Sequence, residues 1–482
     1  MPLIPGYIVV DVGTGNVRVA ITDRLGKILS FERRSMSYLS DEAFESSFYF
    51  NPGELWEKIG NMVKLVLEKA AGQVEIKAIT ASSQREGIVL MDKDGNSLLG
   101  LPNHDHRGRA WEDTVKEKER IYELTGRFPS SLFSAFKLIG TREKYQGLYS
   151  KVSQVLSISD WVQFQLSGVM GYEHSQASET LLYDVEKMVW SDELAGIFGI
   201  NLRMMPPLHH SGEILGTLNA QMASEWDLND NVPVVVGGAD TQLAIKSTRP
   251  MPGDIVLVSG TTTPVVKVVD HYRLDKRQRS WTGRHIERGQ FILETNAGVT
   301  GLNFQRLKEI FYPNEGYEVI ENELKAYQGN NCLASLGSLI AGDAPLTTGG
   351  FFFKVPVGQD LGRAAFIQAA LWDMACSIKE NYNVLVEIED YDRDYVWGCG
   401  GGFQSHTLSS YLGELLQKKI RIRENFSQAS VTGAALVCNE ALGITPTPED
   451  HENVVEIESG TGDGQQYEAW KRWRKNLRQI EI

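Results

Sequence analysis

The sequence predicts an α/β protein made of two related halves, on the basis of three observations. Short apolar runs typical of buried strands alternate along the chain with segments of helical periodicity. The opening stretch, Tyr7–Asp23, combines an apolar run, a Gly-Thr-Gly turn and an alternating run, which predicts two strands joined by a hairpin. The same pattern recurs at Asp254–Val269, about 245 residues later, and such repetition indicates two halves of common design.

The first hairpin carries the clearest chemical signal. Its first strand ends in the carboxylate Asp11, and Gly13, Thr14 and Gly15 form the turn. Because glycine turns can adopt positive φ and present backbone N–H groups, we expect this turn to bind phosphate and Asp11 to face a metal ion. A dinucleotide fingerprint is excluded because Arg18 stands at its third glycine position, and a P-loop is excluded because Gly-Lys-Ser/Thr before a helix is absent. An ordinary glycine hairpin is the structural alternative.

The overall composition is that of a globular protein. The chain has 482 residues, enough for two or three domains, with 42% hydrophobic and 23% charged residues. A net charge of −14 argues against a nucleic-acid partner or an anionic membrane. The N-terminus lacks a signal-peptide pattern, and no apolar run approaches the ~20 residues that span a bilayer, so a cytoplasmic protein is expected. We expect four buried free thiols in a reducing compartment, at Cys332, Cys376, Cys399 and Cys438.

The first half continues with alternating strands and helices. Asn51-Pro52 predicts a helix start, because Asn caps helices and Pro favours the first helical position, and Gly72 is expected to end that helix. The other predicted elements are strands at 27–31, 74–81 and 87–91, a helix at 131–145, a helix capped at Ser159-Asp160 and closed by Gly168, a polar loop at 172–184, and a buried strand at 232–236 followed by Gly237, Gly238 and Asp240.

The second half begins with the second hairpin, in which Ser259 stands where the first half has Asp11. No low-complexity linker separates the halves. The further predicted elements are a helix after Gly301, a long helix at 363–388, a strand entering Gly400–Gly402, a helix capped by Ser405 or Thr407, a small-residue helix at 429–442 and a polar tail at 447–482 with a helical end.

Two polar stretches of the first half are candidate substrate-binding segments. Gln84-Arg85-Glu86 follows a predicted strand, and 102–107 is a loop of mainly polar residues that includes Asp105 and Arg107. A surface ion pair and an ordinary turn are the structural alternatives. Two histidines in the loop lack further ligands at suitable spacing, so no metal is assigned to them.

Three stretches together resemble the FGGY carbohydrate kinases in their order and spacing: Asp11–Gly15, Gly237–Gln242 and Gly400–Gly402. The resemblance covers about residues 7–442. It implies two ribonuclease-H-like (actin-like ATPase) domains with a nucleotide cleft between them. An N-terminal domain at 1–245 would bind substrate and carry the first phosphate hairpin and the catalytic aspartate, and a C-terminal domain at 246–482 would bind adenosine and carry the second hairpin. Within the family, Ser83–Leu90, Ile158–Trp161 and Val234–Gly238 resemble the autoinducer-2 kinases.

The resemblance also implies a role for each candidate residue. Asp11 would lie beside the magnesium ion and the transferred phosphate, and Asp240 would be the general base. The phosphate turns would be Gly13, Thr14 and Gly15 in the first half and Gly260, Thr261 and Thr262 in the second; the adenosine site would include Gly301, Gly400, Gly401 and Gly402; the substrate contacts would be Gln84, Arg85, Glu86, Asp105, Arg107, Asp240 and Gln242.

The sequence departs from the family pattern at three places. Lys137 is followed by Leu138-Ile139-Gly140 where the family has a tryptophan, the second signature is shortened at 355–360, and Gln428 replaces an expected glutamate. These departures concern the lip of the nucleotide site and the substrate rather than the chemistry.

We therefore expect an ATP- and Mg²⁺-dependent kinase that phosphorylates a hydroxyl of a small sugar or polyol. Phosphoryl transfer depends on positioning and charge stabilisation, and Asp240 can accept the hydroxyl proton. Ketose, polyol, sugar acid and autoinducer-type dihydroxy ketone all remain open as substrates, and the oligomeric state is open, a homodimer included. The alternatives are an autoinducer-2 kinase specifically, an actin- or chaperone-like ATP-driven switch, a catalytically silent sugar-binding regulator and, for Asp240, a structural cap.

Overall fold

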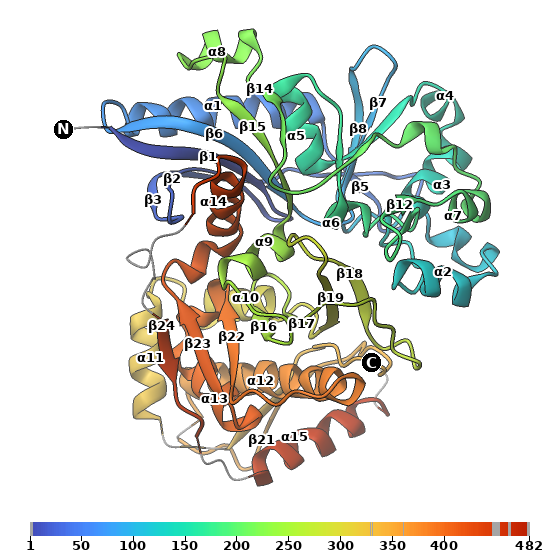
Figure 1. The fold of residues 1–482 in the computed structure, drawn as a ribbon. Coiled ribbons are helices and arrows are strands. Elements are labelled where there is room, and N and C mark those ends of the chain that lie inside the picture. The colour runs from blue at the N-terminus through green and yellow to red at the C-terminus, as the bar shows by residue number, and fades with distance from the viewer. Residues whose placement is uncertain are drawn as a thin grey trace. The chain divides into compact units, whose positions relative to one another are not determined.

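The structure is a computed structural model that describes residues 3–327, 329, 331–359, 361–445, 454–460 and 464–479. The chain divides into two compact units (Figure 1). The first unit comprises Met1–Ser247, Thr282–Phe291 and Ala429–His451, and the second comprises Thr248–Trp281, Ile292–Gln428 and Glu452–Ile482. Residues 282–291 and 429–445 thus pack with the first unit, although the sequence predicts that they belong to the second domain. The assignment of functions to 1–245 and 246–482 stays a prediction.

A six-stranded sheet in the order β14-β15-β6-β1-β2-β3 forms the centre of the first unit. Strand β1 is antiparallel to β2 and parallel to β6, and β15 is parallel to β6 on the other side. The predicted strands of this sheet are confirmed and most are longer than predicted, but the edge strand β14 was not predicted. The bounds are β1 Ile4–Val12, β2 Asn16–Asp23, β3 Ile28–Ser35, β6 Val74–Ser83, β14 Ile214–Thr217 and β15 Pro233–Ala239.

Helix α1 (Pro52–Lys69) begins as predicted, because the Asn51 side chain accepts hydrogen bonds from the first turn, but it ends three residues before Gly72. Helix α5 (Ile158–Ser167) closes at Gly168 as predicted. Its predicted cap at Ser159-Asp160 is wrong: Ser157 has extended backbone, and its hydroxyl accepts the Asp160 N–H.

Helix α14 (Ala429–Ala441), predicted from its small residues, lies against strands β1 and β6 (Figure 1). Its apolar face joins β1 and helix α9 (Asp240–Ser247) in one buried cluster, which explains why this late segment belongs to the first unit. The other helices here are α2 Lys118–Thr125, α3 Ser134–Lys144, α4 Gln146–Tyr149, α7 Asp192–Phe198 and α8 Ala220–Trp226.

The segment 172–184, predicted as a polar loop, is buried throughout and contains short regular elements. These are β10 Tyr172–Glu173, α6 His174–Ala177 and β11 Tyr183–Asp184. The prediction failed because polar side chains can be buried when they bond one another. A three-stranded sheet has β7 (Ile88–Met91) between β8 (Ser97–Leu101) and β9 (Gln154–Ser157). Three two-stranded sheets pair β4 (Leu39–Ser40) with β5 (Phe48–Tyr49), β10 with β13 (Leu208–His209) and β11 with β12 (Val189–Trp190).

The second unit repeats the pairing scheme of the first. Strand β16 is antiparallel to its hairpin partner β17 and parallel to β22, as β1 is to β2 and β6. This repetition confirms that the halves are related. Strand β18 (Trp281–Arg284) spans a point where the chain passes from the second unit to the first. The other strands are β16 Ile255–Val258, β17 Pro264–Val269, β19 Phe291–Asn296, β20 Cys332–Ser335, β21 Gly350–Phe353, β22 Tyr395–Cys399, β23 Lys419–Arg423 and β24 Val454–Ile457.

Helix α12 (Arg363–Ile388) matches its predicted span, and of the two candidate caps for α13 (His406–Leu416) it is Ser405 whose hydroxyl accepts the Leu408 N–H. The predicted polar tail contains the strand β24 and the helix α15 (Gly464–Leu477), while 446–453, 461–463 and 480–482 lie outside the described residues, as does Asp360 of the shortened signature. The remaining helices are α10 Gly301–Phe311 and α11 Tyr317–Ala326.

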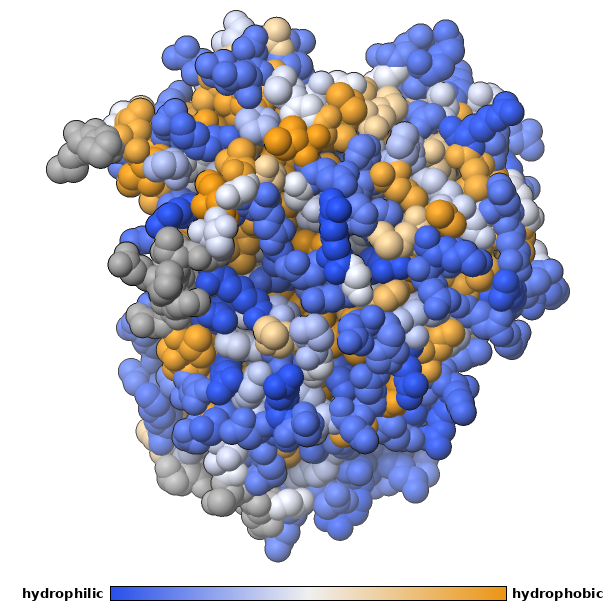
Figure 2. All heavy atoms as spheres, in the orientation of Figure 1, coloured by the Kyte–Doolittle hydropathy of each residue, from blue (hydrophilic) through white to orange (hydrophobic). Residues whose placement is uncertain are grey.

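The expectation of buried free thiols is confirmed, because all four cysteines are unpaired and buried. On the face seen in Figure 2, hydrophilic side chains predominate and apolar ones occur in small groups. None of the described helices combines the length and the hydrophobicity needed to cross a lipid bilayer.

Candidate active site

Two carboxylates lie where parallel strands of the first sheet end. Asp11 is near the end of β1, and Asp240 follows β15 as the first residue of α9. In the sheet register, Ser82 of β6 pairs with Asp11 on one side and with Gly238 on the other. Ligands of α/β sheets characteristically bind beyond the carboxyl ends of such strands. The topology therefore brings these two predicted site residues to one edge of the sheet.

Asp11 is buried, with 2% of its surface exposed. Its Oδ2 accepts hydrogen bonds from Arg18 Nη1 at 3.0 Å and from Ser430 Oγ at 2.9 Å. Its Oδ1 is buried and has no hydrogen-bond partner among the described residues. A buried carboxylate oxygen without a partner is unusual in a native protein and fits one that binds a cation.

A magnesium ion fits this arrangement. Mg²⁺ is commonly bound through one or two carboxylates, with waters and substrate phosphates completing its coordination. Within the described part of the chain, no group of three or more His, Cys, Asp or Glu is arranged to hold a metal without such help. Asp11 is therefore the side chain that would hold Mg²⁺, through Oδ1, in the presence of a nucleotide.

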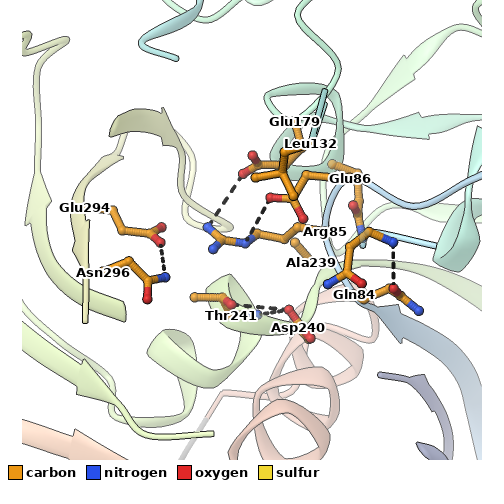
Figure 3. A network of polar contacts seen from close by, with 12 residues as sticks. Gln84, Arg85, Glu86, Leu132, Glu179, Ala239, Asp240, Thr241, Glu294 and Asn296 are labelled. Carbon is orange, nitrogen blue, oxygen red and sulfur yellow. Dashed lines mark hydrogen bonds and ion pairs between the residues drawn. The ribbon is translucent and has the colours of Figure 1, made fainter. Parts of the chain in front are cut away.

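Asp240 has one carboxylate oxygen engaged and one available. Its Oδ1 accepts hydrogen bonds from the Thr241 N–H at 2.6 Å and the Thr241 hydroxyl at 3.2 Å (Figure 3), whereas Oδ2 has no hydrogen bond with any described residue. Burial, followed by the negative charge of Asp11, raises the pKa of Asp240 to about 6, although Arg85 opposes the shift. A carboxylate with a pKa near neutrality and an available oxygen is suited to accept a proton.

Arg85 lies between two carboxylates (Figure 3). Its Nε is 3.9 Å from Glu86 Oε1, and its Nη1 is 3.8 Å from Glu179 Oε1. Glu179 also binds Arg127, with hydrogen bonds of 3.0 and 2.6 Å from Nε and Nη2. All four side chains are buried. We call Arg85, Glu86, Glu179 and Arg127 the Arg85 network.

The two carboxylates of the Arg85 network differ in their titration. Burial, reinforced by the charge of Glu179 and opposed by Arg85, raises the pKa of Glu86 to about 8. Burial also disfavours ionisation of Glu179, but Arg127 and Arg85 together hold its pKa below the ordinary value. Glu86 has a positive φ of 59°, a strained conformation for a non-glycine residue that is often found at functional sites.

Gln242 lies in α9 with none of its surface exposed. Neither polar atom of its side-chain amide forms a hydrogen bond with a described residue, but the amide lies close enough to Glu179 to help hold the pKa of that carboxyl below its ordinary value. The structure thus brings Gln242 to the Arg85 network.

Asp105 and Arg107 contact each other inside the loop that follows β8. Asp105 Oδ1 accepts the Phe48 N–H at 3.0 Å, and Oδ2 accepts from Arg107 Nε at 2.8 Å. Arg107 Nη2 is also 3.5 Å from Asp41. Since both Asp105 and Arg107 are buried, they hold the loop in shape, and a direct contact with substrate stays a prediction.

Lys137 supports the same loop from helix α3. Its ammonium group is buried and donates to the backbone carbonyls of Leu132, Asn103 and Asp105. Burial lowers the pKa of Lys137 to about 8, against the charges of Asp105 and Glu86. This lysine fixes the backbone of the predicted substrate loop.

Gln84 links that loop to the first phosphate turn. Its Oε1 accepts the Asn103 N–H at 2.9 Å, and its Nε2 donates to the Tyr38 hydroxyl at 3.2 Å. Tyr38 in turn donates to the carbonyl of Thr14 at 2.7 Å, and Asn103 Nδ2 donates to Thr14 Oγ1 at 2.9 Å. The Thr14 side chain is therefore part of a continuous hydrogen-bonded connection between the turn and the loop.

The first turn differs from the sequence expectation in its backbone. Neither Gly13 nor Gly15 has a positive φ, so the glycines are not required for a left-handed conformation. A Cβ built on Gly15 would meet no atom within 4 Å, so the turn has open space beside it. That space, rather than unusual dihedral angles, would allow a phosphate to approach the backbone.

In the second unit, the predicted nucleotide glycines assemble around the second turn. A Cβ on Gly301 would lie 1.9 Å from the Gly260 carbonyl oxygen, and Leu302 N–H donates to Thr261 at 3.2 Å. On the other side, Gly402 N–H donates to the Ser259 carbonyl at 3.0 Å, and Gly400 has a φ of +93°. The close approaches require glycine at 301 and 400. The other predicted residues of this group are Thr262 and Gly401.

A pocket of about 410 Å³ adjoins the same helix α10. It is lined by Asn303, Arg306 and Leu307 of the helix and by residues 336–337 and 346–349. It lies within the second unit, one turn beyond Gly301.

Sequence reasoning missed several residues of the site. Glu179 and Arg127 form a buried ion pair within the Arg85 network. Lys137 donates hydrogen bonds to the backbone of the predicted substrate loop. Arg18 and Ser430 donate hydrogen bonds to Asp11. The one available signal was a lysine within the apolar run of α3, since a buried cation needs partners. Glu179 lies in the segment that was predicted as a polar loop, and Ser430 is 419 positions from Asp11.

Comparisons with known proteins show which family the chain resembles in sequence and fold. A sequence model described as the FGGY family of carbohydrate kinases, N-terminal domain, matches residues 6–246. The Bacillus subtilis (strain 168) protein named "Putative sugar kinase YoaC" is 45% identical over 473 residues, covering 98% of this chain and 97% of that protein. An autoinducer-2 kinase of Salmonella paratyphi A is 24% identical over 461 residues, covering 91% of this chain and 86% of the relative.

Among solved structures, a Plasmodium falciparum glycerol kinase with ADP has a TM-score of 0.83. It is 16% identical and covers 100% of both chains, so it supports the fold alone. The predicted two-domain actin-like fold is confirmed by this similarity.

Proposed function

The chain belongs to the FGGY family of carbohydrate kinases, and on that premise we propose how the residues of its first unit perform the transfer. An ATP-dependent kinase of this family phosphorylates an alcohol group. We propose that the acceptor is a hydroxyl of a small sugar or polyol, with Asp240 as general base and Asp11 as the Mg²⁺ ligand. The observation that carries this proposal is the position of the two carboxylates at one sheet edge, with Asp240 Oδ2 available and its pKa raised to about 6.

The proposed step is an in-line displacement. The substrate hydroxyl oxygen forms a bond to the γ-phosphorus of ATP, and the bond from that phosphorus to the β,γ-bridging oxygen breaks. The hydroxyl proton passes to Asp240 Oδ2, and the bond electrons leave with ADP. No other oxidant, reductant or co-reactant is needed.

The residues around Asp11 serve the phosphates. Bound Mg²⁺ would neutralise charge on the phosphate oxygens. Asp11 would hold it through its unpartnered Oδ1, while Arg18 and Ser430 fix the orientation of the carboxylate through Oδ2. The turn at 13–15 would place backbone N–H groups beside the γ-phosphate, in the open space at Gly15.

The Arg85 network would bind the substrate. Arg85 can donate to a carbonyl or hydroxyl oxygen, and Glu86 can exchange a hydrogen bond with a neighbouring hydroxyl. Gln84, Asp105 and Arg107 would act by holding these groups and the loop in place, because their polar atoms bond mainly within the protein. Gln242, whose buried side-chain amide forms no hydrogen bond with any described residue, would contact the substrate directly.

We assign the nucleoside to the second unit. The turn at 260–262, Gly301 and Gly400–Gly402 come together there, and the adjoining pocket of about 410 Å³ is large enough for an adenosine group. The expected location is the cytoplasm, since the four cysteines are buried free thiols.

The test is the variant Asp240→Asn, which preserves shape but cannot accept the proton. We expect sugar-dependent ADP release to fall by about 10²–10⁴-fold, because a general base contributes that much. Nucleotide affinity, measured by calorimetry on the same preparation, should be kept. Asp230→Asn, at an exposed position of the first unit, is the matched control and should have normal turnover.

A folded Asp240→Asn protein with near-normal turnover would reject the proposed mechanism. An ATP-driven switch predicts a different result, namely ATP hydrolysis that no sugar or polyol stimulates. An autoinducer-2 kinase predicts that the dihydroxy ketone precursor of the autoinducer is the preferred acceptor, an outcome favoured by the 24% identity to such a kinase.

A further inference from the structure

We infer that Ser175 is a positioning residue for the proposed base Asp240, because its hydroxyl group fixes the end of the strand from which Asp240 emerges. This role deepens the proposed function and rests on it. Ser175 belongs to the buried segment 173–177, which takes no part in the mechanism proposed above.

Strand β15 changes its pairing just before Asp240. The register of β15 against β6 shifts between Val235 and Gly238, so the regular ladder is interrupted close to the strand end. Irregularities of this kind often occur next to active sites, where they re-aim a side chain. The direction in which Asp240 leaves the strand therefore depends on how the residues after the shift are held.

The Ser175 hydroxyl holds the backbone at this point. Its Oγ accepts the N–H of Ala239 at 3.1 Å, and Ala239 directly precedes Asp240 (Figure 3). The same hydroxyl donates to Glu173 Oε2, so its donor and acceptor are both used. Ser175 and Ala239 have none of their surface exposed. The hydroxyl is therefore a built-in partner for the last backbone N–H before the proposed base.

Glu173 fixes the orientation of the Ser175 hydroxyl. Its Oε2 also accepts the backbone N–H groups of Ser175 at 2.8 Å and of Gln176 at 3.1 Å. The Glu173 N–H in turn donates to Asp160 Oδ2 at 3.2 Å. A Cβ placed on Gly238 would lie 3.1 Å from Glu173 Oε2 and 3.2 Å from Ser175 Oγ, so both groups lie directly against the strand end.

The same segment holds the neighbouring strand. Gln176 Nε2 donates to Ser83 Oγ at 3.0 Å, and Ser83 of β6 is the register partner of Ala239. Ser83 directly precedes the proposed substrate contacts at 84–86. The segment thus fixes two adjacent strand ends, one leading to the proposed base and the other to the proposed substrate contacts.

The test is Ser175→Ala, which removes the acceptor for the Ala239 N–H and adds no bulk. We expect kcat for sugar-dependent ADP release by the full chain to fall about 10–100-fold, because a displaced base loses its alignment with the reacting hydroxyl. The KM for ATP should change less than about twofold, since the change affects a step after nucleotide binding.

Ser178→Ala is the matched control. Ser178 is also buried, and its hydroxyl accepts the Arg284 N–H at 3.1 Å and donates to the His174 carbonyl at 3.0 Å. This variant loses the same kinds of hydrogen bond from the same part of the chain, but neither bond leads to β15. We expect a comparable fall in melting temperature and a normal kcat.

Combination with Asp240→Asn distinguishes positioning from support of the fold. If Ser175 acts through Asp240, adding Ser175→Ala to Asp240→Asn should lower the residual kcat less than about twofold, because residues that act as a unit are not additive. A purely structural role predicts the same fall in both backgrounds. Ser175→Cys, which offers a weak donor and acceptor of similar size, should have a kcat between those of Ser175→Ala and the unmodified protein.

The outcomes separate this role from the proposed function. Near-normal turnover of Asp240→Asn would reject the proposed function and the role of Ser175 with it. If Asp240→Asn is impaired but Ser175→Ala has a normal kcat, or lowers kcat equally in both backgrounds, the inference is wrong and the proposed function stands. Failure of both Ser175 variants to fold, seen in thermal melting, would also overturn the inference. A fall in kcat only where Asp240 is present supports it.

Discussion

The two hairpins of this chain have the same strand pairing and different chemistry. Both join an antiparallel pair whose first strand runs parallel to a third strand, β1 beside β6 and β16 beside β22. The first places Asp11 before its turn, held by Arg18 and Ser430. The second places Ser259 there, in a setting of backbone contacts. The first hairpin therefore places a charged side chain before its turn, whereas the second is closely packed against the neighbouring backbone.

The surroundings explain why the second hairpin lacks a carboxylate. Ser259 is fully buried, and a Cβ on Gly402 would lie 2.0 Å from its Oγ, so a larger side chain has no room. Its hydroxyl is 3.4 Å from that of Thr263, which offers no positive charge. An ionised group there would be buried without compensation. In the proposed mechanism, the first copy of the hairpin therefore serves metal binding and the second serves close packing around the nucleotide.

The sharpest test of this division removes the charge from the first hairpin. Asp11→Asn keeps shape but weakens metal binding, and we expect turnover to fall by about 10³-fold, because a catalytic cation contributes several kcal/mol. The measurement is sugar-dependent ADP release as a function of Mg²⁺ concentration. Ser259→Ala, at the equivalent position, should change turnover only a few-fold. A Mg²⁺ dependence that is unaltered in Asp11→Asn would refute the assigned role.

Local patterns in the sequence were sufficient to predict these hairpins. An apolar run, a glycine turn and a second apolar run are contiguous, so the strands and their repetition could be recognised without knowing any long-range contact. The same holds for Asp240, which directly follows a buried strand. The Ser430 contact to Asp11 could not be predicted, since it depends on helix α14 returning to the first sheet from 419 positions away.

The second test concerns close packing in the second hairpin. Gly301→Ala would place a Cβ 1.9 Å from the Gly260 carbonyl, so the turn must shift. We expect the KM for ATP to rise about 10–100-fold, since overpacking costs about 1–3 kcal/mol. Gly316→Ala is the matched control, because a Cβ there meets nothing within 4 Å. Steady-state kinetics with varied ATP would decide, and equal effects of the two variants would contradict the proposed packing role.

The third test uses pH, because the pKa of the proposed base in the first unit, Asp240, is raised toward neutrality. Asp240 must be deprotonated to accept a proton, and its pKa is raised to about 6. Activity is therefore present above about pH 6 and should fall about tenfold per pH unit below it. The residual activity of Asp240→Asn should lack this acidic limb. A pH profile of kcat/KM that stays flat from pH 7 to pH 5 in the unmodified protein would contradict the assignment.

The polar interior of the first unit shows where sequence patterns fail. Asp105 and Arg107 were correctly placed in one loop, yet their burial and mutual contact depend on Phe48 and Asp41, which are distant in sequence. Polar composition predicted a polar loop at 172–184, whereas Glu179 there is fully buried and paired with Arg127. Composition shows how many polar residues a segment contains. Which of these polar groups form hydrogen bonds with one another depends on the tertiary fold.

The smallest expected effect concerns the connection between the first turn and the substrate loop. Asn103 Nδ2 donates to Thr14 Oγ1 at 2.9 Å, whereas the Thr262 hydroxyl of the second turn forms no comparable hydrogen bond with any residue that the structure describes. Thr14→Val and Asn103→Ala should each lower kcat/KM for the sugar about fivefold, because a lost hydrogen bond costs about 1 kcal/mol. The double variant should be no worse than the poorer single variant, since both changes remove the same interaction. Combining Asn103→Ala with Thr262→Val should instead give additive losses. Additive losses for Thr14→Val with Asn103→Ala would mean that the turn and the loop act independently, and the connection would then be packing without functional coupling.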